Sequence, residues 1–470
     1  MKTLLAIIVL CRVCSLDMFP VMTADSQHYV AKAASHAFTR EPFSLLAPGH
    51  YKTGGYPLFL TAIDGLASLA GADFLTLVVV AQRLLLAAAC LLMVATLGAW
   101  SAPLALFFSS DAFVAQSNFV LTEGVTIPLA ICFSLAALGL HARRNSPAPV
   151  RSPACWALCI GFFASYGLVL LCKIHFAPFA LVAVPLALDI RRSQRRLLVV
   201  RTRLVVPMAL LTLLTIAYVA AVSFNNKAAF DRLTPVIGSE RVRYWGAWEQ
   251  VFEVHPELAS RASLREFRDG GTPYRFLHGV DKECGGIERF ACTGPRNAEQ
   301  RQRLLAASGL SAPVETLRSF ALGFLGGGKQ EILSLRSRVL RVNGDDGTIA
   351  RWQNEMQKRF DGDFNHGAPA RIVPGLCRSA RGPELIRVPQ AVLTLAAIFA
   401  PAWLWFRRRL ALHGPALYAL AAYIVVIAGF SLGFLDEWRY VAPAWAVLAV
   451  AALGDAVRAM RGKKPVSPST

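Results

Sequence analysis

The chain has 470 residues, of which 55% are hydrophobic and only 17% are charged, and its formal net charge is +19. An average soluble domain carries about 25% charged residues, so the composition excludes a disordered chain and a basic nucleic-acid-binding protein. The apolar residues gather in runs that approach the roughly 20 residues needed to cross a bilayer as a helix. We therefore expect an all-α polytopic membrane protein whose basic residues set its orientation in the lipid bilayer.

About ten apolar segments are predicted to span the bilayer. Asp111 interrupts the third segment, which fits a short or re-entrant helix as well as a full span. The N-terminal run resembles a signal peptide, but Arg12 breaks it and no small-residue cleavage site follows at the right distance, so we expect an uncleaved first helix. In chain order the segments are 3–21, 75–99, 102–118, 120–140, 154–172, 174–189, 204–224, 388–405, 415–435 and 441–457.

Clusters of basic residues predict which ends of these segments face the cytoplasm. They lie at 143–151, 191–203, 407–409 and 458–464, and the positive-inside rule places all of them, with both termini, in the cytoplasm. The chain then divides into an N-terminal transmembrane domain, an extracytoplasmic segment of mixed structure, C-terminal transmembrane helices and a cytoplasmic tail. These parts are 1–224 with the first outer loop 22–74, then 225–387, 388–461 and 462–470.

The extracytoplasmic segment contains three cysteines, Cys284, Cys292 and Cys377. In an oxidising compartment, a bond between Cys284 and Cys292 would close a small loop and leave Cys377 unpaired, and the other pairings stay open. A zinc site is disfavoured, because this segment contains no CxxC pair.

Acids and cations gather at the predicted outer turns. A single charge at a helix end commonly sits in interfacial water without any function. Here several turns combine carboxylates, which can take a proton from a hydroxyl nucleophile, with cations that suit a phosphate group. The combination at one depth points to a site for a lipid-linked phosphosugar. The residues are Asp25, His50, Lys52, Glu123, Lys173, Glu437 and Arg439.

Four stretches resemble the GT-C glycosyltransferases, in particular bacterial members similar to protein O-mannosyltransferases and lipid A aminoarabinose transferases. The likeness covers mainly residues 1–140 and 430–457 and does not include the segment 225–387. The stretches are Arg12 followed by DSQHYVAKA at 25–33, GGYPL at 54–58, LTE at 121–123 with Pro128, and EWRYVAP at 437–443.

The resemblance implies an inverting transfer of a sugar from a polyprenyl-phosphate donor to a hydroxyl of a glycan, lipid or protein acceptor, in a bacterial inner membrane. Asp25 would be the catalytic base and Glu123 a supporting acid. Arg439, Lys173, Lys52 and His50 would bind the donor phosphate, with Tyr29, Tyr56, Glu437 and Tyr440 in support. The family usually has a second acid beside its first-loop acid, whereas Ser26 follows Asp25 here, so the participation of a divalent metal stays open. The sequence contains no Walker pattern and no GxGxxG loop that leads into a helix after a strand, so it does not predict a nucleotide cofactor.

Two other classes of membrane protein also fit the sequence. An O-antigen ligase or polymerase would use polyprenyl diphosphate donors and would place its key side chains in the outer segment, which holds Arg241, Arg243, His255 and His278. A transporter or flippase would place charges near the middle of the bilayer, and Arg12, Arg83 and Asp111 are the residues that favour this interpretation.

Overall fold

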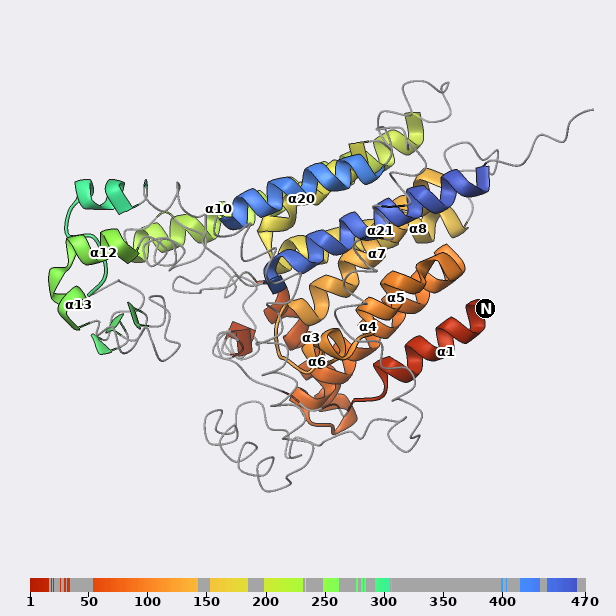
Figure 1. The fold of residues 1–470 in the computed structure, drawn as a ribbon, viewed down its shortest axis with the longest axis horizontal. Coiled ribbons are helices and arrows are strands. Elements are labelled where there is room, and N and C mark those ends of the chain that lie inside the picture. Colours follow the sequence, from red (N-terminus) through yellow and green to blue (C-terminus); the bar gives the residue numbers. More distant parts are fainter. Residues whose placement is uncertain are drawn as a thin grey trace, which may run out of the picture.

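A computed structural model describes the protein over 1–16, 54–142, 153–184, 198–230, 248–261, 292–304, 415–431 and 438–462. Short pieces are also described within 18–33, at 233, within 276–284, at 306, and within 399–403. Over these residues the regular structure is almost wholly helical (Figure 1), in agreement with the expected all-α class.

Four helical stretches are long and apolar enough to cross a membrane: Phe74–Phe108, Glu123–Ala142, Pro153–Cys172 and Met208–Ala229. They belong to α4 (Phe74–Leu97) with its continuation, α7 (Glu123–Ala142), α8 (Pro153–Cys172) and α10 (Leu198–Phe230). The apolar helices α3 (Gly55–Ala70) and η4 (Ile174–Ala183), and Pro415–Val426 within α20 (Pro415–Ser431), are shorter. The protein is therefore a helical membrane protein. The predicted span 388–405 lies almost entirely outside the described residues, and ten spans stay a prediction.

The structure alters several of the predicted segments. The helix expected at 3–21 ends at Val13. The span expected at 102–118 is divided into α5 (Ala102–Phe108) and α6 (Asp111–Gln116). Gly98, with a φ of 70°, ends α4 in a conformation that favours glycine, and the short 3-10 helix η2 (Gly98–Ser101) leads into α5. The first outer loop, expected at 22–74, contains the helix α3. Gly71, with a φ of 60°, ends α3, and the Asp73 carboxylate caps α4 by accepting from the Thr76 amide at 2.7 Å.

The helices α7 and α21 (Trp438–Gly462) run parallel to each other. The Ser134 hydroxyl lies 3.5 Å from the Val447 carbonyl oxygen, and further along both helices Arg458 donates to the Leu138 carbonyl at 3.0 Å. The helix α20 is antiparallel to α21, since the Ala416 amide at its start donates to Asp455 near the end of α21. Because α8 returns antiparallel to α7, the start of α7, the end of α8 and the start of α21 lie at one end of the bundle (Figure 1).

Aromatic side chains fill the core of the bundle. Phe133 stacks on Phe162 and Phe179, with ring centroids 4.7 and 5.8 Å apart, and Trp445 packs against Phe107 and Phe108. Large apolar side chains also cover outer faces of the helices, for example Leu84, Ile160 and Leu213, as lipid contact requires.

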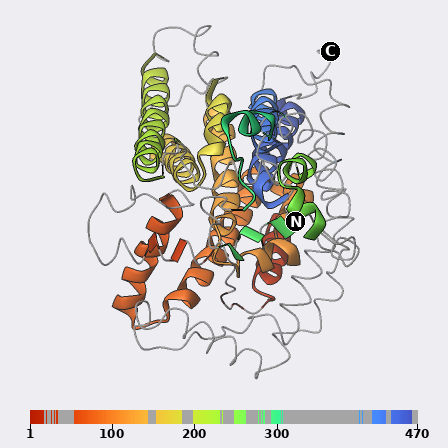
Figure 2. The same ribbon diagram turned by 90° about the vertical axis from the view of Figure 1, so that its left-hand side faces the viewer.

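A second, smaller group of residues lies beyond the bundle. The helix α10 has 33 residues, which correspond to about 50 Å, more than the roughly 30 Å of bilayer hydrocarbon. Beyond its C-terminal end lie α12 (Trp248–Val254) and α13 (Pro256–Arg261), and Figure 2 shows these green elements in front of the bundle. They share a small apolar core with Leu277, Val280 and Leu304. We call the described residues within 248–306 the disulfide cluster.

Candidate functional site

A buried ion pair joins two ends of the bundle helices. Glu123 is the first residue of α7, and Lys173 directly follows α8. The Lys173 Nζ atom lies 2.5 Å from Glu123 Oε1, and the two side chains are 10% and 2% exposed. The Thr122 hydroxyl also donates to Glu123 Oε2, at 3.1 Å. Buried charges are tolerated when they are paired and hydrogen-bonded, and here both conditions are met.

Tyr56 and Gln82 extend this polar group into α3 and α4. The Tyr56 hydroxyl donates to Gln82 Oε1 at 3.0 Å, and Gln82 Nε2 donates to the carbonyl oxygens of Ser117 and Phe119 at 3.0 and 2.8 Å. The Tyr56 hydroxyl is also within electrostatic reach of the Glu123 carboxylate. We call Tyr56, Gln82, Glu123 and Lys173 the polar centre.

Two glycines allow the polar centre to pack so closely. A Cβ atom at Gly55 would lie 2.4 Å from the Leu171 carbonyl carbon, and a Cβ atom at Gly124 would lie 2.4 Å from Gln82 Oε1. Only glycine fits such contacts without movement of the neighbouring atoms. The GGYPL stretch therefore places the start of α3 directly against the end of α8, next to Lys173.

The described residues of the first loop that precede α3 are buried beside the polar centre. Ser26, Tyr29 and Lys32 are at most 4% exposed, and the Tyr29 ring meets the Tyr56 ring edge-on, with centroids 5.0 Å apart. Burial lowers the pKa of the Lys32 ammonium to about 8, because desolvation disfavours its charged form. The sequence analysis did not single out Lys32 as a site residue.

Arg83 is a structural cation in the membrane-spanning helix α4. Its guanidinium donates to the Val13 carbonyl and to Asn118 Oδ1, each at 2.7 Å, and to the Ser117 hydroxyl at 2.6 Å. It thus ties the end of α1 (Lys2–Val13) to the turn after α6. Arg12 similarly donates to the Ser109 carbonyl at 3.3 Å. Packing between helices accounts for these two arginines, which the transporter interpretation used as pathway charges.

The other predicted site residues are only partly described. Asp25, His50, Lys52 and Glu437 lie outside the described residues. Arg439 and Tyr440 belong to the first turn of α21, and their side chains are not described. Because α21 runs parallel to α7, the backbone of this turn lies at the same end of the bundle as Glu123.

The structure brings Glu123, Lys173, Tyr56 and Tyr29 together. The sequence analysis named these four residues without predicting the ion pair, and it missed Gln82. The signal for Gln82 was present, since Gln82 and Arg83 interrupt an otherwise apolar helix of 24 residues. A polar side chain inside a membrane helix has a high free-energy cost unless it is hydrogen-bonded to a partner.

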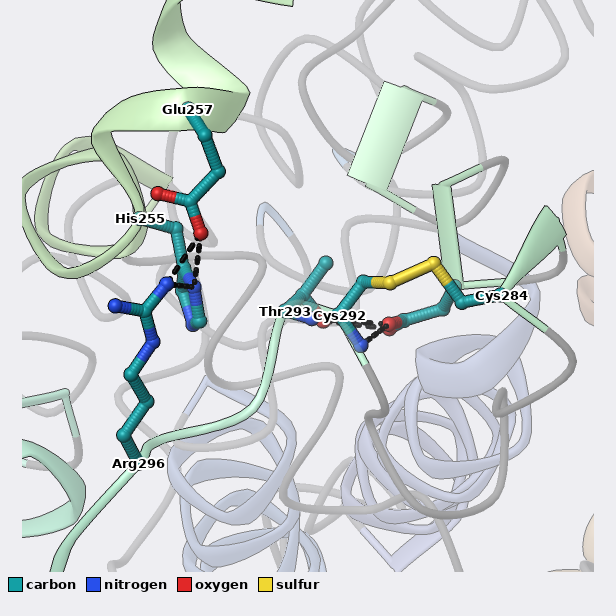
Figure 3. The surroundings of a disulfide bond; sticks show 7 residues. His255, Glu257, Cys284, Cys292, Thr293 and Arg296 are labelled. Carbon is teal, nitrogen blue, oxygen red and sulfur yellow. Dashed lines mark hydrogen bonds and ion pairs between the residues drawn. A yellow bond between two sulfur atoms is a disulfide. The ribbon is translucent and has the colours of Figure 1, made fainter.

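The disulfide cluster is organised differently (Figure 3). Cys284 and Cys292 form a disulfide, the pairing that would close a small loop, and the Asp281 carboxylate accepts from the amides of Cys292 and Thr293 at 3.2 and 3.0 Å. Cys377, Arg241, Arg243 and His278 lie outside the described residues.

His255 in this cluster has partners at both ring nitrogens. Nε2 lies 2.7 Å from the Gly294 carbonyl oxygen, and Nδ1 lies 3.2 Å from Glu257, which also pairs with Arg296. The backbone amide of Glu257 donates to the Glu257 carboxylate. This bond, together with the contacts to His255 and Arg296, lowers the pKa of Glu257.

Among the described residues, no group of three or more His, Cys, Asp or Glu side chains could hold a metal ion. Comparisons with protein-family models, characterised proteins and solved structures find no match to the chain. No family is therefore assigned, and the geometry of the polar centre is the only support for a functional site there.

Proposed function

We propose that the protein is an integral-membrane glycosyltransferase that moves a sugar from a polyprenyl-phosphate donor to an acceptor hydroxyl. The observation that carries the proposal is the buried Glu123–Lys173 pair, 2.5 Å apart, at the end of the bundle where Arg439 lies in the first turn of α21. An ammonium and a guanidinium at headgroup depth suit a lipid phosphate. The apolar faces of the surrounding helices suit its polyprenyl chain.

The disulfide supports an outward orientation of the polar centre. Disulfides persist in oxidising compartments, and the disulfide cluster lies beyond the same end of the bundle at which Glu123 and Lys173 lie (Figure 1). We therefore assign this end to the extracytoplasmic side of a bacterial inner membrane. The two termini and the basic clusters at 143–151 and 458–464 are then cytoplasmic, as the positive-inside rule requires.

The proposed reaction is a direct displacement at the anomeric carbon. Asp25 takes the proton of the acceptor hydroxyl, the acceptor oxygen attacks the anomeric carbon, and the bond from that carbon to the lipid phosphate oxygen breaks. The lipid phosphate leaves with the bonding electrons, and Lys173 and Arg439 stabilise its charge. The attack from the opposite face inverts the anomeric centre.

The ion pair changes the role proposed for Glu123. Its carboxylate is 2% exposed and is held by Lys173 and Thr122, so it is poorly placed to take a proton from an acceptor. We assign it to orienting the Lys173 ammonium toward the donor phosphate. The Lys173 ammonium donates to Glu123 Oε1, so the carboxylate fixes the direction in which the ammonium lies.

Two observations favour the transferase over the other candidates. A ligase or polymerase would use a histidine of the outer segment, and His255 is 4% exposed with both ring nitrogens in contact with protein groups. A transporter would use buried arginines, and Arg83 is bonded to two separate segments of the protein, at Val13 and at Ser117 with Asn118.

A donor assay tests the proposal. Purified protein in lipid nanodiscs would be given polyprenyl monophosphates and diphosphates that each carry one labelled sugar, together with a membrane extract as acceptor. We expect transfer from a monophosphate donor, and its loss in Asp25→Asn. The matched control is Asp64→Asn, an acid in α3 outside the polar centre, which should retain transfer. Transfer from diphosphate donors alone, or full turnover by Asp25→Asn, would overturn the assignment.

A further inference from the structure

Gln82 belongs to the polar centre and is bonded to the Tyr56 hydroxyl and to two main-chain carbonyl oxygens. It is fully buried in α4, where an unsatisfied amide would cost several kcal/mol. Its two N–H groups point to the carbonyl oxygens of Ser117 and Phe119. Carbonyl oxygens can only accept hydrogen bonds, so the atom that faces both of them must be the nitrogen.

This orientation settles the bond to Tyr56. Gln82 Oε1 is an acceptor, so the Tyr56 hydroxyl, 3.0 Å away, must donate to it. The hydroxyl proton is then committed to Gln82, and the Tyr56 oxygen presents only lone pairs to its other neighbours. Tyr56 is fully buried, so these bonds hold α3 in place rather than contact a substrate.

Gln82 thereby fixes the backbone on both sides of the ion pair. Ser117 and Phe119 belong to the turn that leads into Glu123, and Gly124, directly after Glu123, lies against the Gln82 amide. Through Tyr56, Gln82 also holds the start of α3, where Gly55 packs on Leu171, two residues before Lys173. One side chain thus connects the segment that carries the acid with the segment that carries the cation.

We propose that Gln82 is a positioning residue, which holds Glu123 and Lys173 at bonding distance through the 117–119 turn on one side and through Tyr56 and α3 on the other. For its role in turnover, the inference rests on the proposed function. For the geometry of the ion pair, it requires no substrate and can be tested without one.

The test measures the reactivity of the Lys173 amine in the full chain in nanodiscs. An ammonium held by a carboxylate is a poor nucleophile, so reductive methylation of Lys173, followed by peptide mass spectrometry, reports on the pair. We expect Gln82→Leu to raise the methylation rate at least fivefold. A change of about fivefold in population is what the loss of a single hydrogen bond produces, and this substitution removes all three bonds of the amide. Glu123→Gln gives the upper limit.

The matched control is Gln116→Leu, the same substitution at a glutamine of α6 that is also buried but makes none of these bonds. It should react as the original protein does. Tyr56→Phe removes a single oxygen atom and should raise the rate about twofold to threefold, because the amide keeps its carbonyl partners. If Gln82→Leu does not fold, Tyr56→Phe provides the test in its place. Original rates in both Gln82→Leu and Tyr56→Phe, with a raised rate in Glu123→Gln, would overturn the proposal.

The transferase assay separates this proposal from the proposed function. Gln82→Leu should lower kcat more than it changes KM, because a misplaced Lys173 weakens stabilisation of the leaving phosphate. If the original protein transfers no sugar while Lys173 reactivity changes as expected, the proposed function fails and the positioning role stands. If transfer occurs and Lys173 reactivity is unchanged in Gln82→Leu and Tyr56→Phe, the positioning role fails alone.

Discussion

The polar centre and the disulfide cluster each contain a Glu paired with a cation, and the surroundings of the two pairs differ. Glu123 and Lys173 are 2% and 10% exposed, whereas Glu257 and Arg296 are 54% and 56% exposed. Water screens the second pair, and such pairs add little to stability. The first pair lies in a low-dielectric interior, where the loss of one partner strands a charge. Burial therefore makes the polar centre the better candidate for chemistry that depends on charge.

The largest expected effect comes from separating the buried pair. Glu123→Gln should lower the free energy of unfolding by about 3–5 kcal/mol, because it leaves the Lys173 ammonium buried without its carboxylate. The double variant Glu123→Gln with Lys173→Met should recover much of that loss. Denaturant unfolding in a fixed lipid composition measures both. A cost below about 1 kcal/mol for the single variant would show that the pair behaves like an exposed one.

Lys32 should make stability depend on pH. Its pKa is about 8 in the folded protein and 10.5 in its ordinary state. Below pH 8 the residue is charged in both states and its burial penalty, on the order of 3 kcal/mol, acts fully against folding. Between pH 8 and 10.5 the folded state has lost the proton that the unfolded state still binds. Stability from this residue therefore rises with pH across that window.

The measurement is thermal unfolding on both sides of this window. Lys32→Met should be more stable than the original protein below pH 8, and the two should converge toward pH 10.5. Other lysines contribute equally to both proteins, so the difference between them is the informative quantity. A difference that does not change with pH would exclude the buried ammonium as its source.

The disulfide should matter for its own cluster and not for the bundle. Replacing Cys284 and Cys292, which are 8 residues apart, with serine should destabilise the cluster by about 2.5 kcal/mol, the entropy of closing so short a loop. Hydrogen exchange should accelerate in residues 248–306 and stay unchanged in α7 and α8. Faster exchange in α7 would show that the two regions unfold together.

The smallest effect is expected for the exposed acid. Glu257→Gln repeats the chemistry of Glu123→Gln at a surface position, and it should leave the unfolding transition where it is, because solvent screens the lost charge. The same denaturant experiment serves for both. A loss as large as that at Glu123 would remove the contrast between the two regions.

The sequence predicts much of the membrane helices because long apolar runs leave few alternatives. The spans expected at 120–140 and 154–172 match α7 and α8 closely, and the charge at Glu123 marks the beginning of α7. The interruption at Asp111 correctly predicted a weak third segment. The positive φ of Gly98, which turns the chain into α5, leaves no comparable signal, because many glycines occur within apolar helices without ending them.

Contacts between distant segments are the part that the sequence does not predict. Glu123 and Lys173 are 50 residues apart, and Arg83 and Val13 are 70 residues apart. Hydrophobic periodicity places each residue on a helix but not in register with the neighbouring helix. Gln82 is a polar residue in an apolar run and so needs partners, but the sequence does not identify them, because they lie in α3 and in the 117–119 turn.

The parallel helices α7 and α21 each contain a proline as their sixth residue, Pro128 and Pro443. Proline lacks the N–H that would bond to the carbonyl four residues earlier. Two main-chain oxygens, those of Gly124 and Arg439, are thereby released from the regular ladder, one beside the buried acid and one on the proposed phosphate-binding residue. Replacing either proline with alanine would restore the missing N–H and return one of these two oxygens to the hydrogen bonds of its helix.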